Sequence, residues 1–205
     1  VTAATRARDA GVAYKVHFQL IDYRDLAENC RTDSFAFDRI VSVGMFEHVG
    51  QPQFKTFFEA CATMLDRDGV MLLHTIGRLG GPGSTDAFTR KYIFPGGYIP
   101  ALSETVAASE PCRLIATDVE TLRLHYARTI RAWYAHCLAN KQAIIDLYDE
   151  RFFRMWTFYL AGAATVFEAG GMCNYQIQYA RSRHALPITR DYIEAEERRL
   201  LKANS

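Results

Sequence analysis

The stretch Phe37–Gly50, with the sequence FDRIVSVGMFEHVG, constrains the fold of this chain more than any other. Arg39–Val43 is a short apolar run of the kind found in parallel strands that are covered on both faces, and Gly44 ends it. Glu47 and His48 follow directly. Because open α/β sheets bind ligands beyond the carboxyl ends of their strands, two ionisable residues there are placed for chemistry. The alternative is that they only begin the next helix.

Strands and helices alternate around this stretch, which is the pattern of an α/β protein with a parallel sheet. We predict strands over 16–21, 39–43, 70–76, 113–119 and 173–179. We predict helices over 52–65, 87–94, 103–109 and 189–203, and a further helix that ends near residue 10. Residues 120–170 are predicted to be helical in two or more pieces. Residues 1–205 then make a single domain with one helical insertion.

Charge and cysteine content narrow the classes of function. The formal net charge is +1, so the chain shows no electrostatic footprint for nucleic acid. Its five cysteines are scattered without a CxxC pair, which favours reduced thiols and argues against a zinc site or a disulfide framework. No apolar run is long enough to span a bilayer. We therefore expect a cytoplasmic protein, without a bound metal, whose contact with a membrane is peripheral.

Five motifs in order resemble the cyclopropane-fatty-acyl-phospholipid synthases and the related mycolic acid cyclopropane synthases. They are FDRIVSVGMFEHVG, LLHTIG, KYIFPGGYIP, HYARTIRAWY and RFFRMWTFYL. The resemblance extends from about Val16 to Arg183. It implies the class I S-adenosylmethionine-dependent methyltransferase fold, a Rossmann-like sheet with a helical lid over 120–170. It also implies S-adenosylmethionine as cofactor and an unsaturated phospholipid at the membrane surface as substrate, whose cis double bond becomes a cyclopropane ring.

The resemblance also implies upstream parts that this sequence does not contain. The family has a glycine-rich cofactor loop, an acidic residue for the ribose hydroxyls and an active-site cysteine before the region where this chain begins. We therefore expect an N-terminally truncated methyltransferase domain that is inactive alone. Loss of the first strands would leave an unpaired sheet edge. The chain is then expected either to dimerise through this edge or to be observed with that material missing.

The resemblance assigns catalytic roles to particular residues. In the family, a bound bicarbonate is taken to be the base that removes a proton as the ring closes. Its ligands would be Glu47 of FEHVG, His74 of LLHTIG, Tyr126 of HYARTIRAWY and the backbone N–H of Ile76. Because two parallel strands end before Glu47 and at His74, both belong to one edge of the sheet. A carboxylate repels an anion, so Glu47 either accepts the bicarbonate's own proton or is itself protonated.

Two further residues are assigned to the cofactor. Asp22 and Tyr23 follow the predicted strand over 16–21. In class I methyltransferases an acid at this point commonly accepts a hydrogen bond from the adenine amino group, and the next side chain lies against the ring. The alternative for Asp22 is a local cap. Taken alone, His74 would be a satisfied core histidine and Tyr126 an ordinary helix tyrosine.

Aromatic side chains are concentrated in Phe152–Tyr159, with Tyr92, Phe94 and Trp133 elsewhere. They predict either a fatty-acyl channel, whose ring faces could stabilise a nearby carbocation, or a plain helix–helix core. Two other functions compete with ring formation. One is methyl transfer to another unsaturated lipid, and the other is a non-catalytic remnant that binds lipid or a protein partner.

Overall fold

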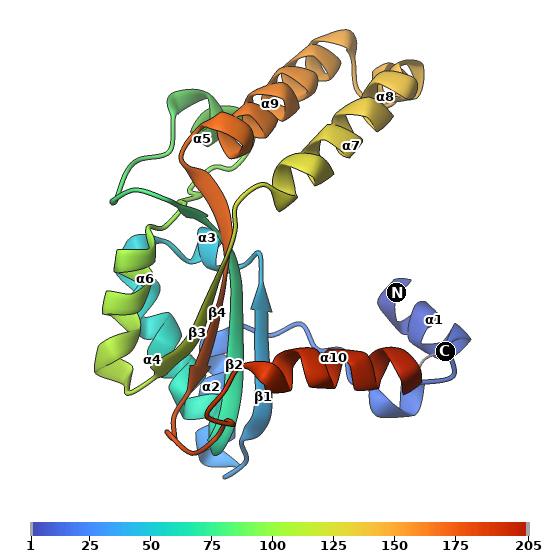
Figure 1. The fold of residues 1–205 in the computed structure, drawn as a ribbon. Helices are drawn as coiled ribbons and strands as arrows, with labels where there is room; N and C mark the ends of the chain where they lie inside the picture. Colours follow the sequence, from blue (N-terminus) through green and yellow to red (C-terminus); the bar gives the residue numbers. More distant parts are fainter. Residues whose placement is uncertain (1, 204–205) are drawn as a thin grey trace.

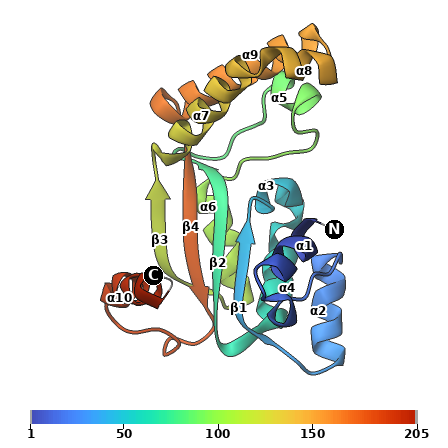
Figure 2. The same cartoon turned by 90° about the vertical axis from the view of Figure 1, so that its right-hand side faces the viewer.

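The computed structural model of the chain describes residues 2–203, which are built around a four-stranded sheet in the order β1-β2-β4-β3 (Figure 2). The strands are β1 (Phe37–Val43), β2 (Leu65–Arg78), β3 (Ile115–Leu122) and β4 (Met172–Ala180). β1 and β2 pair in parallel, whereas β4 runs antiparallel to both β2 and β3. The predicted α/β class is confirmed. The first two strands form a parallel β1–α4–β2 unit.

The α-helices of the described chain include most of the predicted ones, with ends shifted by a few residues, and two that were not predicted, over 23–32 and 46–49. They are α1 (Thr2–Asp9), α2 (Tyr23–Thr32), α3 (Phe46–Val49), α4 (Phe54–Met64), α5 (Ala87–Tyr92), α6 (Leu102–Ser109), α7 (His125–Ala139), α8 (Lys141–Leu147), α9 (Glu150–Ala169) and α10 (Asp191–Ala203). The helical insertion predicted over 120–170 begins later than expected, because β3 continues to Leu122. It consists of the three helices α7, α8 and α9.

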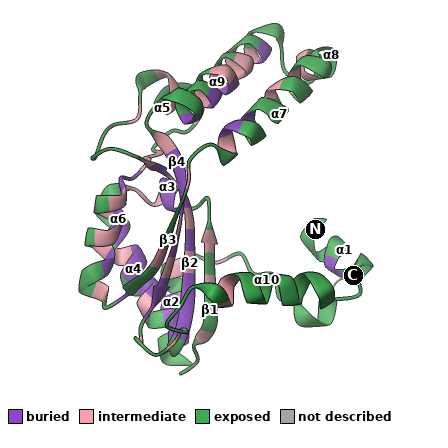
Figure 3. Ribbon diagram, in the orientation of Figure 1, coloured by how far each residue is buried: buried purple, intermediate pink, exposed green. Residues whose placement is uncertain are grey.

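One face of the sheet is covered by α2, α4 and α6 (Figure 1). The predicted apolar stripe of α4 points into this layer, where Phe57 and Phe58 are 1% and 0% exposed. The ring of Phe58 packs edge-on against Tyr179 of β4, with centroids 5.4 Å apart. Buried residues are concentrated in β2, β4 and the helices against them (Figure 3). The main core is therefore the layer between the sheet and these three helices.

The other face of the sheet is open, which corrects one prediction. The strand over 39–43 was expected to be covered on both faces, but Val41 and Val43 are each 65% exposed. In the described part of the chain α2 and α4 lie behind β1, and α1 and α10 extend away from the open side (Figures 1 and 2). The apolar pattern of β1 was recognised correctly. What covers each face depends on distant segments.

The prediction of a strand over 16–21 is wrong. The backbone is extended at Val16, with φ −123° and ψ 124°. Residues 16–22 nevertheless pair with no strand of the described chain. Leu20 is fully exposed. An extended segment becomes a strand only when a neighbour accepts and donates its backbone hydrogen bonds, and β1 ends the sheet on this side.

The helical insertion stands beyond one end of the sheet, above the carboxyl ends of β1 and β2 (Figure 1). α7 and α9 pack against each other around a second small core, to which Ile130, Leu160 and Phe167 contribute. No helix within residues 2–203 has the length and apolar character needed to cross a bilayer. The insertion therefore forms a separate helical layer over the edge where the site residues are predicted.

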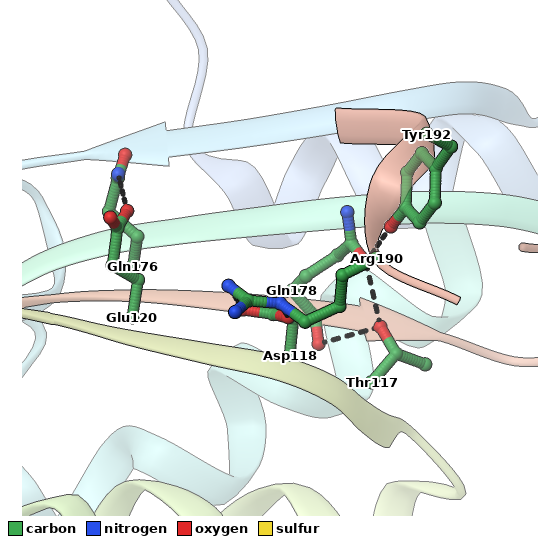
Figure 4. Close-up of polar contacts among 7 residues, drawn as sticks. All are labelled: Thr117, Asp118, Glu120, Gln176, Gln178, Arg190 and Tyr192. Carbon is green, nitrogen blue, oxygen red and sulfur yellow. Dashed lines mark hydrogen bonds and ion pairs between the residues drawn. The ribbon is translucent and has the colours of Figure 1, made fainter. Parts of the chain in front are cut away.

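α10 is joined to the open face at its first turn (Figure 4). The Tyr192 hydroxyl donates to Oε1 of Gln178 at 2.8 Å. Arg190, just before the helix, forms an ion pair with Asp118 of β3. The rest of the helix is mostly exposed, as its charged sequence predicted.

The buried hydroxyl of Tyr179 predicts loss of stability in alkaline solution. Within residues 2–203 it has no partner at good hydrogen-bond geometry, and burial raises its pKa to about 12, partly opposed by the nearby Ser109 hydroxyl. Unfolded tyrosine ionises near about pH 10, so above that pH the native state holds a proton that the unfolded state has lost. The free energy of unfolding should therefore fall as the pH rises from about 10 through 12.

The free energy of unfolding, measured with urea, should fall between about pH 8 and about pH 11.5. We expect this fall to be smaller in Tyr179→Phe, by up to about 2 kcal/mol. The control is Tyr14→Phe, because the Tyr14 side chain is 81% exposed. Equal pH dependence of the two variants would contradict the prediction.

Candidate active site

The site lies where β1 ends beside β2. β2 itself continues past this point to Arg78 along β4, so His74 lies within its strand and not at the strand's end as predicted. Val43 and His74 are the last residues in register between β1 and β2. The N–H of Gly44 then donates to the His74 carbonyl at 3.1 Å. Gly44 has φ +63°, a left-handed conformation that favours glycine, and it turns the chain into α3 at the sheet edge.

Glu47 binds the backbone of β2 just beyond the point where pairing with β1 stops. Its helix, α3, is a single turn anchored by Phe46, which is 0% exposed and stacked on Phe54 with centroids 4.2 Å apart. Because pairing with β1 ends at His74, the N–H of Ile76 has no partner in that strand. Glu47 Oε1 accepts from this N–H at 2.6 Å. Glu47 therefore does more than begin a helix, since its carboxylate satisfies a backbone N–H of β2 that lies beyond the end of β1.

The second oxygen of Glu47 is left over. Glu47 is 8% exposed, and its Oε2 is buried without a hydrogen-bond partner in the described chain. Such an atom can accept a hydrogen bond from a water molecule or a ligand. The O–H of bicarbonate is one such donor. The fourth predicted ligand is less free than expected, because the Ile76 N–H already donates to Glu47.

His74 is held from the neighbouring strand. Asn174 Nδ2 of β4 lies 3.2 Å from His74 Nε2. Asn174 is 5% exposed. The alternating sequence of 173–179 places Asn174 on one strand face with Gln176 and Gln178, and nothing in that pattern marks Asn174 for the site. The missing signal is the pairing of β2 with β4, which places Asn174 opposite Ile76, two residues beyond His74.

Tyr126 reaches the site from the helical insertion. Its ring lies edge-on to those of Phe167 and Trp133, with centroids 5.1 Å and 5.8 Å away. Burial raises the pKa of its hydroxyl, and the charge of Glu47 raises it further. The hydroxyl is therefore a hydrogen-bond donor at neutral pH, close enough to Glu47 to feel its charge. The structure brings all four predicted ligands of the bicarbonate to one end of the sheet.

The aromatic set lies around this end, and much of it is exposed. Tyr159 of α9 sits near Tyr126, and burial raises its pKa to about 12, with a smaller contribution from Tyr126. Its ring is edge-on to Phe94, 6.1 Å between centroids. Phe158 is 66% exposed and Trp133 46%. These two are not plain helix–helix core, and the acyl channel stays a prediction.

The predicted cofactor residues lie at the start of α2. Asp22 caps this helix by accepting from the Arg24 N–H at 2.9 Å. Its carboxylate also forms an ion pair with the Arg24 guanidinium, and these hydrogen bonds hold the pKa of Asp22 at about 2. The alternative role of Asp22 as a local cap is therefore present in the structure. To contact adenine, the Asp22 carboxylate would have to accept a hydrogen bond from the adenine amino group in addition to those from Arg24.

A hollow of about 220 Å³ opens beside these residues. It is lined by Tyr23, Arg24, Met45, His48, Val49 and Gln53. Tyr23 packs edge-on against Phe57, 5.7 Å between centroids, which fixes its ring at the margin of the hollow. The cofactor roles of Asp22 and Tyr23 remain predictions, and they would place the adenine ring at this hollow.

The sequence model of the family described as "Mycolic acid cyclopropane synthetase" matches residues 2–177. The chain belongs to this family. The sequence resemblance is thus confirmed. Cyclopropane-fatty-acyl-phospholipid synthase of Escherichia coli (strain K12) is 40% identical over 162 residues, which are 79% of this chain and 40% of that enzyme. A "Probable fatty acid methyltransferase" of Pseudomonas putida is 37% identical over 196 residues, covering 91% of this chain and 48% of that protein.

Solved structures of the family share the fold. The crystal structure of a mycolic acid cyclopropane synthase complexed with SAH and CTAB superposes with a TM-score of 0.66 at 34% identity. The superposition covers 71% of this chain and 55% of that structure. The predicted S-adenosylmethionine-dependent methyltransferase fold is confirmed. The chain spans about half or less of the length of the two curated relatives, 40% and 48%.

Proposed function

We propose that this chain is the catalytic part of an enzyme that forms cyclopropane rings in the acyl chains of unsaturated phospholipids. The observation that carries the proposal is the buried Oε2 of Glu47, which has no hydrogen-bond partner within residues 2–203 and lies near enough to Tyr126 for the Glu47 charge to raise the pKa of the Tyr126 hydroxyl. Methyl transfer to a nucleophile that has already lost its proton does not need a buried site for a base. Ring closure does, because a proton must leave as the third carbon–carbon bond forms.

Each site residue has a distinct task in this proposal. S-adenosylmethionine supplies the methyl carbon when bound. The Tyr126 hydroxyl would donate a hydrogen bond to the bicarbonate. Glu47 Oε2 would accept a hydrogen bond from the bicarbonate's own O–H. His74, on β2, would orient the same anion. Ring faces of the insertion, such as Tyr159, would stabilise positive charge on the substrate by about 0.5–2 kcal/mol.

The partners follow from the same proposal. The substrate is a phospholipid at the membrane surface, so the enzyme would act from the cytoplasm as a peripheral protein. The outer edge of β1 is unpaired within the described chain, and Val41 and Val43 are exposed beside it. A second copy of the chain could pair with this edge, and we propose a homodimer as one form of the protein.

A second candidate is methyl transfer to an unsaturated lipid without ring closure. The similarity to the Pseudomonas putida protein, named as a probable fatty acid methyltransferase, supports it. The two candidates share cofactor and lipid and differ in the product. Chromatography of the modified fatty acids against cyclopropane and methyl-branched standards separates them.

Cofactor binding is the first test. We would titrate S-adenosylhomocysteine calorimetrically into this chain and into the chain preceded by the N-terminal part of the Escherichia coli relative. We expect tight binding and conversion of unsaturated phospholipid only with the second protein. Tight binding by both would show that our account of the cofactor site is wrong. Binding by neither would favour a non-catalytic remnant.

A further inference from the structure

We infer that Asn174 is a positioning residue, which holds the His74 imidazole in one tautomer and one orientation toward the proposed bicarbonate site. The inference deepens the proposed function and rests on it for the role of His74. The geometry around the two side chains can be tested without any activity.

The contact joins the two central strands of the sheet. Asn174 Nδ2 is 3.2 Å from His74 Nε2. The register pairs Ile76 with Asn174 and His74 with Gln176, so all four side chains share the open face of the sheet. The backbone on both sides of the contact is fixed by strand pairing, β2 with β1 and β4, and β4 with β3. Such a support can hold a ring within the narrow limits that a site needs.

The amide oxygen of Asn174 is available to accept a hydrogen bond from a ligand. Asn174 is 5% exposed and its Oδ1 is buried without a partner. Within residues 2–203 only four buried side-chain atoms lack a partner, and Glu47 Oε2 is another of them. The backbone of Ile76 lies between the two residues, bonded to Glu47 and in register with Asn174. Two unsatisfied acceptors on either side of Ile76 both suit a ligand that carries a proton.

An amide is suited to this position because it can either donate or accept. In the structure it donates to His74 Nε2, which leaves the imidazole proton on Nδ1. After protonation of the ring, the Oδ1 of a turned amide could accept from it. Nearby ionisable groups are Glu47 from α3, Tyr126 from α7 and Glu120 from β3. Glu120 is occupied by Gln176 at 2.8 Å, and the hydrogen bond that the structure gives the His74 ring comes from Asn174.

The test is nitrogen NMR of the histidine rings in this chain, with His74→Phe to identify the His74 signals. We expect one neutral tautomer, protonated on Nδ1, in the unsubstituted chain and a mixture of tautomers in Asn174→Leu. In Asn174→Asp a carboxylate faces the ring, so the imidazole should remain protonated to a pH about one unit higher or more. The matched control is Gln178→Glu, the same change four residues along the same strand face.

Unchanged His74 signals in both Asn174 variants, or an equal shift in the control, would overturn the inference. The second readout is enzymatic activity, measured with whichever of the two proteins in the calorimetric test binds S-adenosylhomocysteine. We expect Asn174→Leu to lower kcat by about tenfold or more, with KM for the cofactor unchanged and the acid limb of the pH profile moved. If no form is active while the NMR shifts are present, the proposed function fails and the positioning role stands.

Discussion

Replacement of Glu47 by glutamine is expected to abolish ring formation and leave the fold intact. Glutamine keeps an oxygen that can accept from the Ile76 N–H, which lies 2.6 Å from Glu47 Oε1, so this backbone N–H of β2 stays satisfied. In place of the free Oε2 it carries an NH₂ group, which cannot accept the bicarbonate's proton. We expect kcat to fall by about 10²–10⁴-fold, the usual range for loss of a group that handles a proton.

The measurement is cyclopropane product formed from unsaturated phospholipid vesicles by the cofactor-binding form of the protein. The control is Glu104→Gln. Glu104 is a half-buried carboxylate that accepts from the Tyr98 hydroxyl and from the Ala101 N–H, but it has no predicted role in the chemistry. Equal thermal unfolding of the Glu47 variant and the parent shows that the fold is kept. Full activity of Glu47→Gln, or equal loss in the control, would remove Glu47 from the site.

Site residues that lie at strand ends could be predicted from the sequence, because strand ends have local signals. An apolar run followed by Gly44 marks the end of β1, and Glu47 comes three residues later. The strand that carries His74 is also an apolar run, but it continues past His74 to Arg78, so only the end of β1 was predicted correctly. Tyr126 could not be found this way. An ordinary helix tyrosine has no local mark, and only the family resemblance raised it.

The errors concern contacts between distant segments. Residues 16–21 have the composition of a strand, but no strand of the described chain lies beside them. Val41 has the apolar character of a covered residue, yet it faces an open side of the sheet. Asn174 was missed because its importance comes from the register of β4 against β2, nearly 100 residues apart along the chain. Periodicity shows that a residue lies on a face and cannot show what that face meets.

Phe58→Ala is expected to destabilise the chain by about 3–5 kcal/mol, the usual cost of truncating a buried phenylalanine. The ring is 0% exposed and lies against Phe46, Phe57 and Tyr179, with centroids 5.6 Å, 5.3 Å and 5.4 Å away. Because the other sheet face is open, the layer behind β1 and β2 holds most of the buried apolar area. A domain is stable by only about 5–15 kcal/mol, so this loss would remove a large part of the total.

The matched control is Phe158→Ala, whose ring is 66% exposed and touches Phe88 edge-on at 5.2 Å between centroids. We expect it to cost less than about 1 kcal/mol, because little apolar area returns to water. Urea unfolding of both variants measures the difference. A similar cost for the two would show that the helix-covered layer does not hold the fold together. Since Phe46 anchors α3 in that layer, the same result would also leave the placement of Glu47 without its support.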